Sequence, residues 1–296
     1  MTELNRPLPR FSPTRVLQIS ASGSILLLIL LTWIYYAEPF SSLLSPYWND
    51  KATDILTLAA AIGAALAGTR VANQFEKDEA PYRIWGAFAI GLWCWVAGEF
   101  CGFYYDAIYW DTGYPDLTFI DLFWMLGYLF LGLSLYYQYR LIFGKNNKRG
   151  TRYYLAVILL ALLITAVLTN IVINNNLGQG SAWIVLFITV LYPVFDLAEG
   201  VSALHLSYLF GRGQWIRPWW GLILFALSDS LNSFYWLGGY DLLPKSFYTA
   251  LNLISVVSYT ASYLVMGLAL LSLYFMFHYS EASGLLQPAF QINSKK

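Results

Sequence analysis

The stretch YPDLTFIDLFWMLGYLFLGLSLYY, residues 114–137, begins as a polar segment that includes Asp121 and continues as an apolar run. Its core, GYLFLGLSL, nearly returns as SYLVMGLAL at 262–270, which aligns Tyr128 with Tyr263. A helix that crosses a lipid bilayer needs ~20 predominantly apolar residues. The stretch therefore predicts a membrane-spanning helix that the chain contains twice, with a carboxyl group at its start.

The composition of the whole chain agrees with a membrane environment. Hydrophobic residues make up 58% and charged residues 11%, against about 25% charged residues in an average soluble domain. This number of charges is too small to hydrate the surface of a soluble globule of this size. We therefore expect the protein to lie in a lipid bilayer. The formal net charge is zero, which argues against nucleic acid as a partner because nucleic-acid-binding proteins usually carry a basic stripe.

Eight apolar stretches are long enough to span a bilayer. They are residues 16–37, 53–74, 84–105, 119–141, 153–174, 183–209, 219–238 and 248–278. Three arginines precede the first stretch, as in a secretory signal. Its apolar run continues without a small-residue cleavage site, so we expect it to remain as the first helix.

The basic residues predict the orientation, since cytoplasmic loops collect Lys and Arg. With the N-terminus inside, the predicted outer segments hold only Lys51 and Lys245, and the other lysines and arginines fall on the cytoplasmic side. Adding or losing one span would remove this excess of Lys and Arg on the cytoplasmic side. The sequence therefore predicts an all-α integral protein of the cell membrane, with both termini inside and cytoplasmic tails at 1–15 and 279–296.

A second internal match supports a duplication. GLWCWVAGE at 91–99 lies over GLILFALSD at 221–229, which aligns Glu99 with Asp229 at nearly the same offset as the first match. Four spans per unit is an even number, so both copies enter the membrane the same way round, as in a parallel repeat about an axis along the membrane normal. The predicted four-helix units are 16–145 and 146–278.

Carboxyl groups fall within or at the ends of the predicted spans. They are Glu99, Asp121, Asp196, Glu199 and Asp229. A charge near the bilayer centre costs at least ~2.5 kcal/mol on the insertion scale, so such residues usually face a cavity or a partner. No Lys or Arg stands at a mid-span position to neutralise them. Two chemical states stay open: protonated carboxyls hydrogen-bonded to nearby side chains, or carboxylates that hold a cation or a basic ligand.

Single residues also have structural alternatives. Asp121 follows PDLTF, where an acid complements the free N–H groups and the dipole of a helix start. Asp196 and Glu199 share one helix face. A structural polar network with Ser228, Ser230 or Asn232 is an alternative to a ligand site. His205, further along the same helix, is expected to hydrogen-bond within the packed bundle.

As a set, these acids predict a site. Glu99 and Asp229 are repeat equivalents, which would place them on opposite sides of a pseudo-two-fold axis, and aromatic residues surround the acids in the sequence. We expect an outward-opening acidic pocket with aromatic walls, for a small-molecule or cationic ligand that the sequence does not name. The candidate lining residues are the five acids together with Trp124, Tyr128, Tyr235 and Tyr263.

Enzyme signatures are weak. Asp196 and Asp229 resemble the paired carboxyls of intramembrane aspartyl proteases, but Phe195 replaces the tyrosine of the YD motif, and ALSD lacks both glycines of GxGD. The sequence has no HExxH zinc motif, GxSxG elbow, P-loop or GxGxxG turn. We therefore expect a non-enzymatic protein without a catalytic or metal site.

The acid-bearing WVAGEFCGFYYD, followed by PDLTFIDLFWMLGYLFLGLSL, resembles membrane input domains of bacterial signalling proteins of the diguanylate-cyclase or histidine-kinase type. Their pattern is W…GE…, then P-x-x-S-x-A-D-x-(aromatic)-x-x-x-x-Y, in tandem multi-helix repeats. The matching residues are Gly98, Glu99, Pro115, Asp121, Phe123 and Tyr128. Thr118 and Ile120 depart from the pattern, where the family prefers Ser and Ala.

The resemblance extends over residues 50–275, since YPVFDLAEGVSALHL at 192–206 is similar to the helix that opens the second half in that family. It implies a sensory domain followed by an output module. Only about 18 residues follow the last predicted helix here, so the output is expected from a partner protein. Two other hypotheses stay open, an accessory subunit of a larger membrane complex and a transporter coupled to cations or protons.

Overall fold

The computed structural model describes residues 12–41, 45–109, 115, 117–143, 183–210, 213–236 and 244–283, with scattered positions between 152 and 166. Within these residues the chain is helical and contains no strand. The elements are α1 (Pro13–Ala37), α2 (Tyr47–Ala72), α3 (Ala80–Tyr109), α4 (Phe119–Phe143), α6 (Trp183–Phe210), the short 3-10 helix η1 (Gln214–Ile216), α7 (Arg217–Trp236) and α8 (Lys245–Ser283). Of these, α1, α2, α3, α4, α6 and α8 are long and apolar enough to cross a membrane, as expected of an all-α, multi-pass membrane protein.

Two of the eight predicted spans differ from this set. The fifth, 153–174, lies largely outside the described residues, and the positions described there are helical. The seventh, 219–238, corresponds to α7, which is not among the six helices apolar enough to span. Its second half carries Asp229 among serines and an asparagine, which lowers its hydropathy.

Several helices begin before the apolar stretches that predicted them, because backbone hydrogen bonding continues where the side chains become polar. α1 begins at Pro13 after Ser12, whose side chain accepts a hydrogen bond from the backbone N–H of Arg15 at 3.3 Å. Proline at the first helical position and serine at the cap are both favoured there. α2 begins at Tyr47 rather than at residue 53, which brings Lys51 into the helix.

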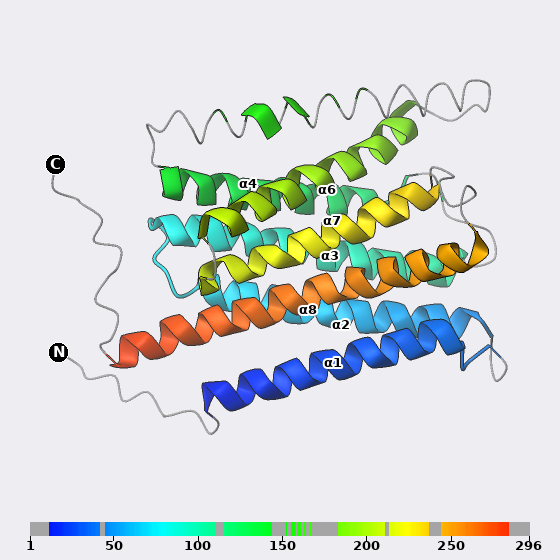
Figure 1. Cartoon of the computed structure of the whole chain (residues 1–296), viewed down its shortest axis with the longest axis horizontal. Helices are drawn as coiled ribbons and strands as arrows, with labels where there is room; N and C mark the ends of the chain where they lie inside the picture. The colour runs from blue at the N-terminus through cyan, green and yellow to red at the C-terminus, as the bar shows by residue number, and fades with distance from the viewer. Residues whose placement is uncertain are drawn as a thin grey trace.

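The helices alternate in direction across the bundle (Figure 1). α1, α3 and α7 run one way, while α2, α4, α6 and α8 run the other, so α1 begins and α8 ends on the left of the view. α3 packs on α4 and α7 packs on α8, while α2 lies against both α3 and α8. We call the end at which α2, α4, α6 and α8 begin the cavity end.

Small residues let α2 approach its neighbours closely, as the spacing of Ala60, Ala64 and Gly68 predicts. A Cβ placed on Gly68 would lie 3.5 Å from the Cα of Ala89 in α3, and one placed on Gly267 of α8 would lie 3.4 Å from the backbone N of Ala64. The buried residues of both helices, among them Ala61, Ala64, Tyr263 and Met266, make α2 and α8 part of the interior.

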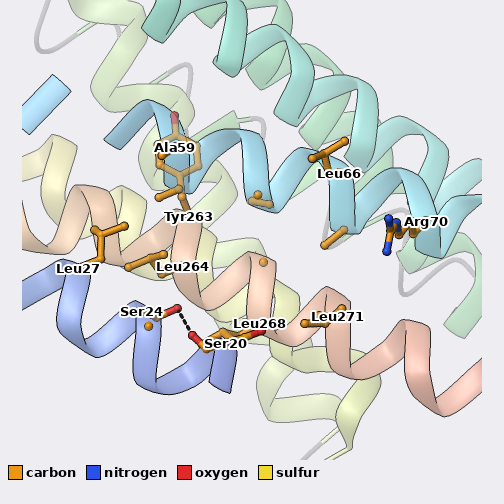
Figure 2. Close-up of a pocket in the computed structure, with 16 residues that line it drawn as sticks. Ser20, Ser24, Leu27, Ala59, Leu66, Arg70, Tyr263, Leu264, Leu268 and Leu271 are labelled. Atoms are coloured by element: carbon orange, nitrogen blue, oxygen red, sulfur yellow. Dashed lines mark hydrogen bonds between the residues drawn. The ribbon is translucent and has the colours of Figure 1, made fainter. Parts of the chain in front are cut away.

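α1 is the peripheral helix, since only Leu31 and Ile34 are buried along it. In its first half, small residues including Ser20 and Ser24 face α2 and α8 across a pocket of about 450 Å³, with Arg70 of α2 also in its lining (Figure 2). The Ser24 hydroxyl donates to the backbone carbonyl of Ser20 at 2.9 Å, within α1 itself. This pocket is therefore lined mainly by small and apolar side chains.

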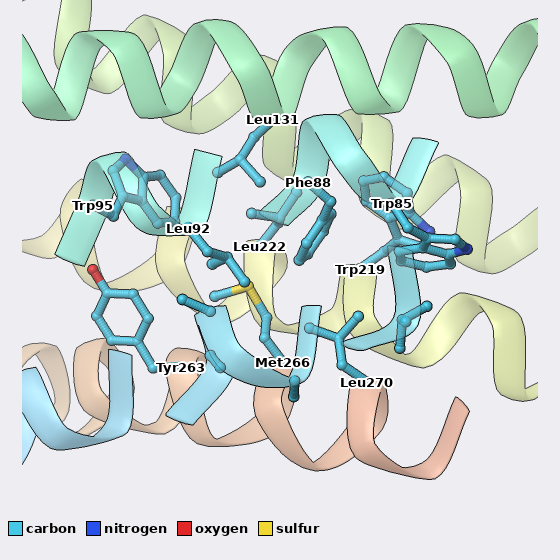
Figure 3. Close-up of a cluster of buried hydrophobic side chains, with 14 of the residues drawn as sticks. Trp85, Phe88, Leu92, Trp95, Leu131, Trp219, Leu222, Tyr263, Met266 and Leu270 are labelled. Carbon is cyan, nitrogen blue, oxygen red and sulfur yellow. The ribbon is translucent and has the colours of Figure 1, made fainter. Parts of the chain in front are cut away.

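Large aromatic side chains fill the centre of the bundle (Figure 3). Trp85 lies beside Trp219, with ring centroids 5.9 Å apart, at one end of this cluster. Trp95 of α3 stacks on Phe225 of α7 at the other, with centroids 4.1 Å apart and an interplanar angle of 15°. These rings bridge α3 and α7, and Trp95 and Phe225 also line the cavity described below.

Glycines set the spacing within the two closest helix pairs. A Cβ on Gly91 of α3 would lie 2.7 Å from the side chain of Leu131 in α4. A Cβ on Gly221 of α7 would lie 2.1 Å from the side chain of Met266 in α8. A larger residue at either position would push the paired helices apart.

Candidate functional site

A cavity of about 870 Å³ lies at the cavity end of the bundle. Residues from α2, α3, α4, α6, α7 and α8 line it, and α1 contributes Tyr35. Its carboxyl groups are Asp50, Asp54, Glu99, Asp106, Asp121, Asp196 and Asp229. Aromatic rings form much of the remaining wall: Trp95, Phe103, Trp124, Tyr128, Tyr192, Phe225 and Tyr259. The volume is within the range of small-molecule sites, about 300–1,000 Å³.

Two carboxyl groups from different helices meet at Tyr128 of α4. Its hydroxyl donates to Asp196 Oδ1 of α6 at 2.5 Å and lies 3.3 Å from Asp229 Oδ2 of α7. A phenol has one proton, so it can donate fully to one carboxylate only. Asp196 is 2% exposed, and its Oδ2 is buried without a hydrogen-bond partner in the structure. We call Tyr128, Asp196 and Asp229 the two-acid cluster.

Around Glu99 of α3 the proportion of carboxyl groups to phenols is reversed. Its Oε1 accepts hydrogen bonds from two phenols of α8, Tyr263 at 2.8 Å and Tyr259. Tyr263 is fully buried, and Glu99 is half-buried because it faces the cavity. Two donors therefore serve one carboxyl group. We call Glu99, Tyr259 and Tyr263 the two-tyrosine cluster.

Asp121 lies in the first turn of α4 and also faces the cavity. Its Oδ2 accepts from the backbone N–H of Thr118 at 2.8 Å, while the Thr118 hydroxyl accepts from the N–H of Ile120 at 3.1 Å. The reciprocal bonds are those of a capping box. The other oxygen, Oδ1, accepts from the hydroxyl of Tyr192 in α6 at 2.8 Å. Asp121 thus caps the start of its helix and holds α6 against α4.

Two polar residues of α6 lie apart from the cavity. Glu199 shares a helix face with Asp196 as predicted, but it faces Gly132 of α4 and is not among the cavity-lining residues. It is 6% exposed. His205 lies further along α6, where its Nδ1 is 2.8 Å from the hydroxyl of Tyr139, in agreement with the prediction that it hydrogen-bonds within the bundle.

A buried lysine lies beside the same cavity, and its partners Asp54, Phe103 and Asp106 line it. Lys51 of α2 is 2% exposed, and its Nζ is 2.8 Å from both Asp54 Oδ2 and Asp106 Oδ2. It also donates to the backbone carbonyl of Phe103 at 3.3 Å and lies 4.8 Å from the centroid of that residue's ring. Two carboxylates, a carbonyl and an aromatic face thus surround this ammonium group.

Most of the predicted site residues meet in this cavity. Glu99, Asp121, Trp124, Tyr128, Asp196 and Asp229 line it, and Tyr263 joins it through its bond to Glu99. The exception is Glu199, because one further helical turn carries it past the cavity. Tyr235 is in the last turn of α7, and its side chain lies outside the described part of the structure.

Sequence analysis missed the acids that surround Lys51, namely Asp54 and Asp106, together with Asp50 beside them. The uneven distribution of Lys and Arg between the two predicted sides could have indicated these acids. Lys51 is one of only two basic residues on the predicted outer side, so it was the exception that needed an explanation. Its partners come from the first turns of α2 and the last turns of α3, both beyond the most apolar parts of those helices.

Comparisons of the chain with protein-family models, with curated protein sequences and with solved structures find no match. In the part of the chain that the structure describes, no group of three or more His, Cys, Asp or Glu side chains is arranged to hold a metal ion. The function must therefore be argued from the geometry of the cavity.

Proposed function

We propose that the chain is a sensory or ligand-binding domain of the cell membrane, without enzymatic activity, that takes a small molecule into the acidic, aromatic cavity from outside. It has eight spans with both termini in the cytoplasm, arranged as two parallel four-helix units. A partner protein, contacted by the bundle, carries the output. The observation that carries the proposal is the convergence of seven carboxyl groups and a wall of aromatic rings on one cavity.

Reciprocal contacts support the two-unit arrangement. The repeat aligns Tyr128 with Tyr263 and Glu99 with Asp229. Tyr128 of the first unit lies on Asp229 of the second, and Tyr263 of the second unit donates to Glu99 of the first. Exchanging the two units converts one contact into the other, which is the relation expected across a two-fold axis.

Packing contacts agree with the same alignment. Gly91 lies against Leu131, and their repeat equivalents Gly221 and Met266 lie against each other in the same way. Trp95 stacks on its own equivalent, Phe225. A residue that touches its own repeat equivalent is expected at the axis itself.

The distribution of charge supports the orientation. Arg70 and Arg140 are near the last turns of α2 and α4, and Arg217 begins α7, so all three lie at the end of the bundle opposite the cavity. Under the positive-inside bias this end faces the cytoplasm. The cavity then opens toward the outside.

Among the residues that the structure describes, the two-acid cluster is the feature that favours chemistry, since aspartyl proteases activate water between two carboxyl groups. Here the Tyr128 hydroxyl lies in contact with both carboxyls, where such a water would have to bind. This arrangement supports a binding role. A transporter that moves cations or protons is the second candidate, and the same buried acid pair is the observation that favours it.

The test is purification of the full chain in a mild detergent, followed by native mass spectrometry. We expect a small molecule to be released when the protein is unfolded in the gas phase. A stoichiometric protein without a small molecule would support an accessory subunit instead. Finding neither a small molecule nor a protein in repeated preparations would contradict the proposal. If proteoliposomes instead show a cation-driven flux that Asp229→Asn abolishes, the protein is a transporter.

A further inference from the structure

The protein binds one ammonium group of its own beside the cavity, through residues that line it. The Lys51 Nζ has two carboxylate oxygens at 2.8 Å, a carbonyl oxygen at 3.3 Å, and the rings of Phe103 and Tyr47 at 4.8 and 5.6 Å. An ammonium group has three N–H donors, and here each finds an acceptor. Cation–π attraction from the two rings adds to the binding.

The two-acid cluster offers similar chemistry without an ammonium group. Asp196 Oδ2 is a buried acceptor that lacks a partner, Asp229 faces the cavity, and the Tyr128 oxygen still has lone pairs after its proton is donated to Asp196. Three acceptor groups, two carboxyls and a phenol oxygen, therefore meet at one place. A buried acceptor without a donor costs about 1–3 kcal/mol, so a molecule that brings donors is stabilised there.

Aromatic rings surround these acceptors as they surround Lys51. Phe195 stacks on Tyr128 with centroids 5.5 Å apart, while Trp95 and Tyr192 approach the same ring edge-on at 5.5 and 6.1 Å. Aromatic faces and edges of this kind accommodate the carbon skeleton of an organic cation, and the faces attract its charge.

We propose that the cavity binds an organic ammonium compound, with its ammonium group against Asp196 and Asp229 and its carbon skeleton against the aromatic wall. This inference rests on the proposed ligand-binding function and names the chemical class of the ligand. Hard divalent cations need about six oxygen ligands, whereas an ammonium group needs the three acceptors that the cluster provides.

Binding is tested with the full chain in lipid nanodiscs, by isothermal titration calorimetry. The probes are phenethylammonium, its uncharged analogue 2-phenylethanol, its anionic analogue 3-phenylpropionate, and the chlorides of sodium, potassium and magnesium, all at equal ionic strength. We expect phenethylammonium to bind at least tenfold more tightly than either analogue. Equal binding of the alcohol, or tighter binding of an inorganic cation, would overturn the inference.

Two substitutions locate the ammonium group. Asp196→Asn keeps the shape of the side chain and removes its charge, so we expect phenethylammonium binding to weaken about 10- to 100-fold, as for a lost hydrogen bond to a charged group. Glu199→Gln is the matched control, because it removes a buried acid from the same helix outside the cavity, and binding should be unchanged. Equal effects of the two substitutions would contradict the assignment.

A second measurement keeps the inference testable if Asp196→Asn does not fold. Lys51→Ala empties the internal ammonium site, so n-butylammonium should raise the melting temperature of this variant by more than it raises that of the natural protein, while n-butanol should not. Absence of this rescue would show that the surroundings of Lys51 do not select an ammonium group, and the argument by analogy would fail.

The outcomes separate the two proposals. If none of the ammonium probes binds but native mass spectrometry finds a neutral or anionic small molecule, the ammonium assignment is wrong and the ligand-binding function stands. If no probe binds and no small molecule is found, both proposals are wrong.

Discussion

The two polar clusters of the cavity use the same residue types in opposite proportion. In the two-tyrosine cluster, Glu99 accepts from Tyr259 and Tyr263, so donors exceed carboxyl groups. In the two-acid cluster, Tyr128 serves both Asp196 and Asp229, so carboxyl groups exceed donors. The first cluster is complete within the protein, whereas the second leaves a buried oxygen without a partner.

In the proposed repeat, the difference traces to single residues on equivalent helices. The repeat that aligns Tyr128 with Tyr263 also aligns Trp124 with Tyr259, so α4 has an indole where α8 has a phenol. The Trp124 indole N–H is buried and has no hydrogen-bond partner in the structure. Under the proposed duplication, one cluster serves stability and the other is left for a ligand.

The largest expected effect comes from removing the acceptor of the two-tyrosine cluster. Glu99→Ala leaves two phenols of α8 without their acceptor and opens a cavity. Each unsatisfied group costs about 1–3 kcal/mol, although hydrogen bonds inside membrane proteins average nearer ~0.6 kcal/mol. We expect a loss of about 3 kcal/mol in the free energy of unfolding, measured by denaturant titration in mixed micelles.

Glu99→Gln is the matched variant, because its amide oxygen still accepts from the phenols. It should cost about 1 kcal/mol, near the contribution of one hydrogen bond. Equal destabilisation by the two variants would mean that Glu99 acts through its charge, and the contrast between a structural cluster and a ligand cluster would then be lost.

Much of this arrangement could be predicted from the sequence, for a simple physical reason. Apolar spans leave a carboxyl group few places to lie, so Glu99, Asp196 and Asp229 were expected to face one another, and they line one cavity. The helical period predicts that Glu199 lies on the same face of α6 as Asp196. How far the cavity extends along that face depends on how α6 packs against α4. The partners of Lys51 depend on which helix ends meet, and local sequence does not specify that.

A smaller effect is expected where both units share their packing. Gly91→Ala and Gly221→Ala each place a methyl group against the neighbouring helix, 2.7 and 2.1 Å from a side-chain atom. Overpacking typically costs 1–3 kcal/mol, and we expect about 2 kcal/mol for each in the same titration. Gly102→Ala is the control, because nothing lies within 4 Å of its Cβ position. Loss of stability in only one of the two glycine variants would show that the units are not packed alike.

The smallest effect compares the two tyrosines directly. Tyr263→Phe leaves Glu99 with the bond from Tyr259, so it should cost no more than about 0.6 kcal/mol, the average for a hydrogen bond in a membrane protein. Tyr128→Phe removes the one phenol that serves Asp196 and Asp229, so it should cost about 1–2 kcal/mol in the absence of ligand. Because an ammonium ligand would bring its own donors, phenethylammonium should restore part of the stability lost in Tyr128→Phe and none of that lost in Tyr263→Phe. Equal responses of the two variants to the probe would mean that the excess of acid around Tyr128 is not what selects the ligand.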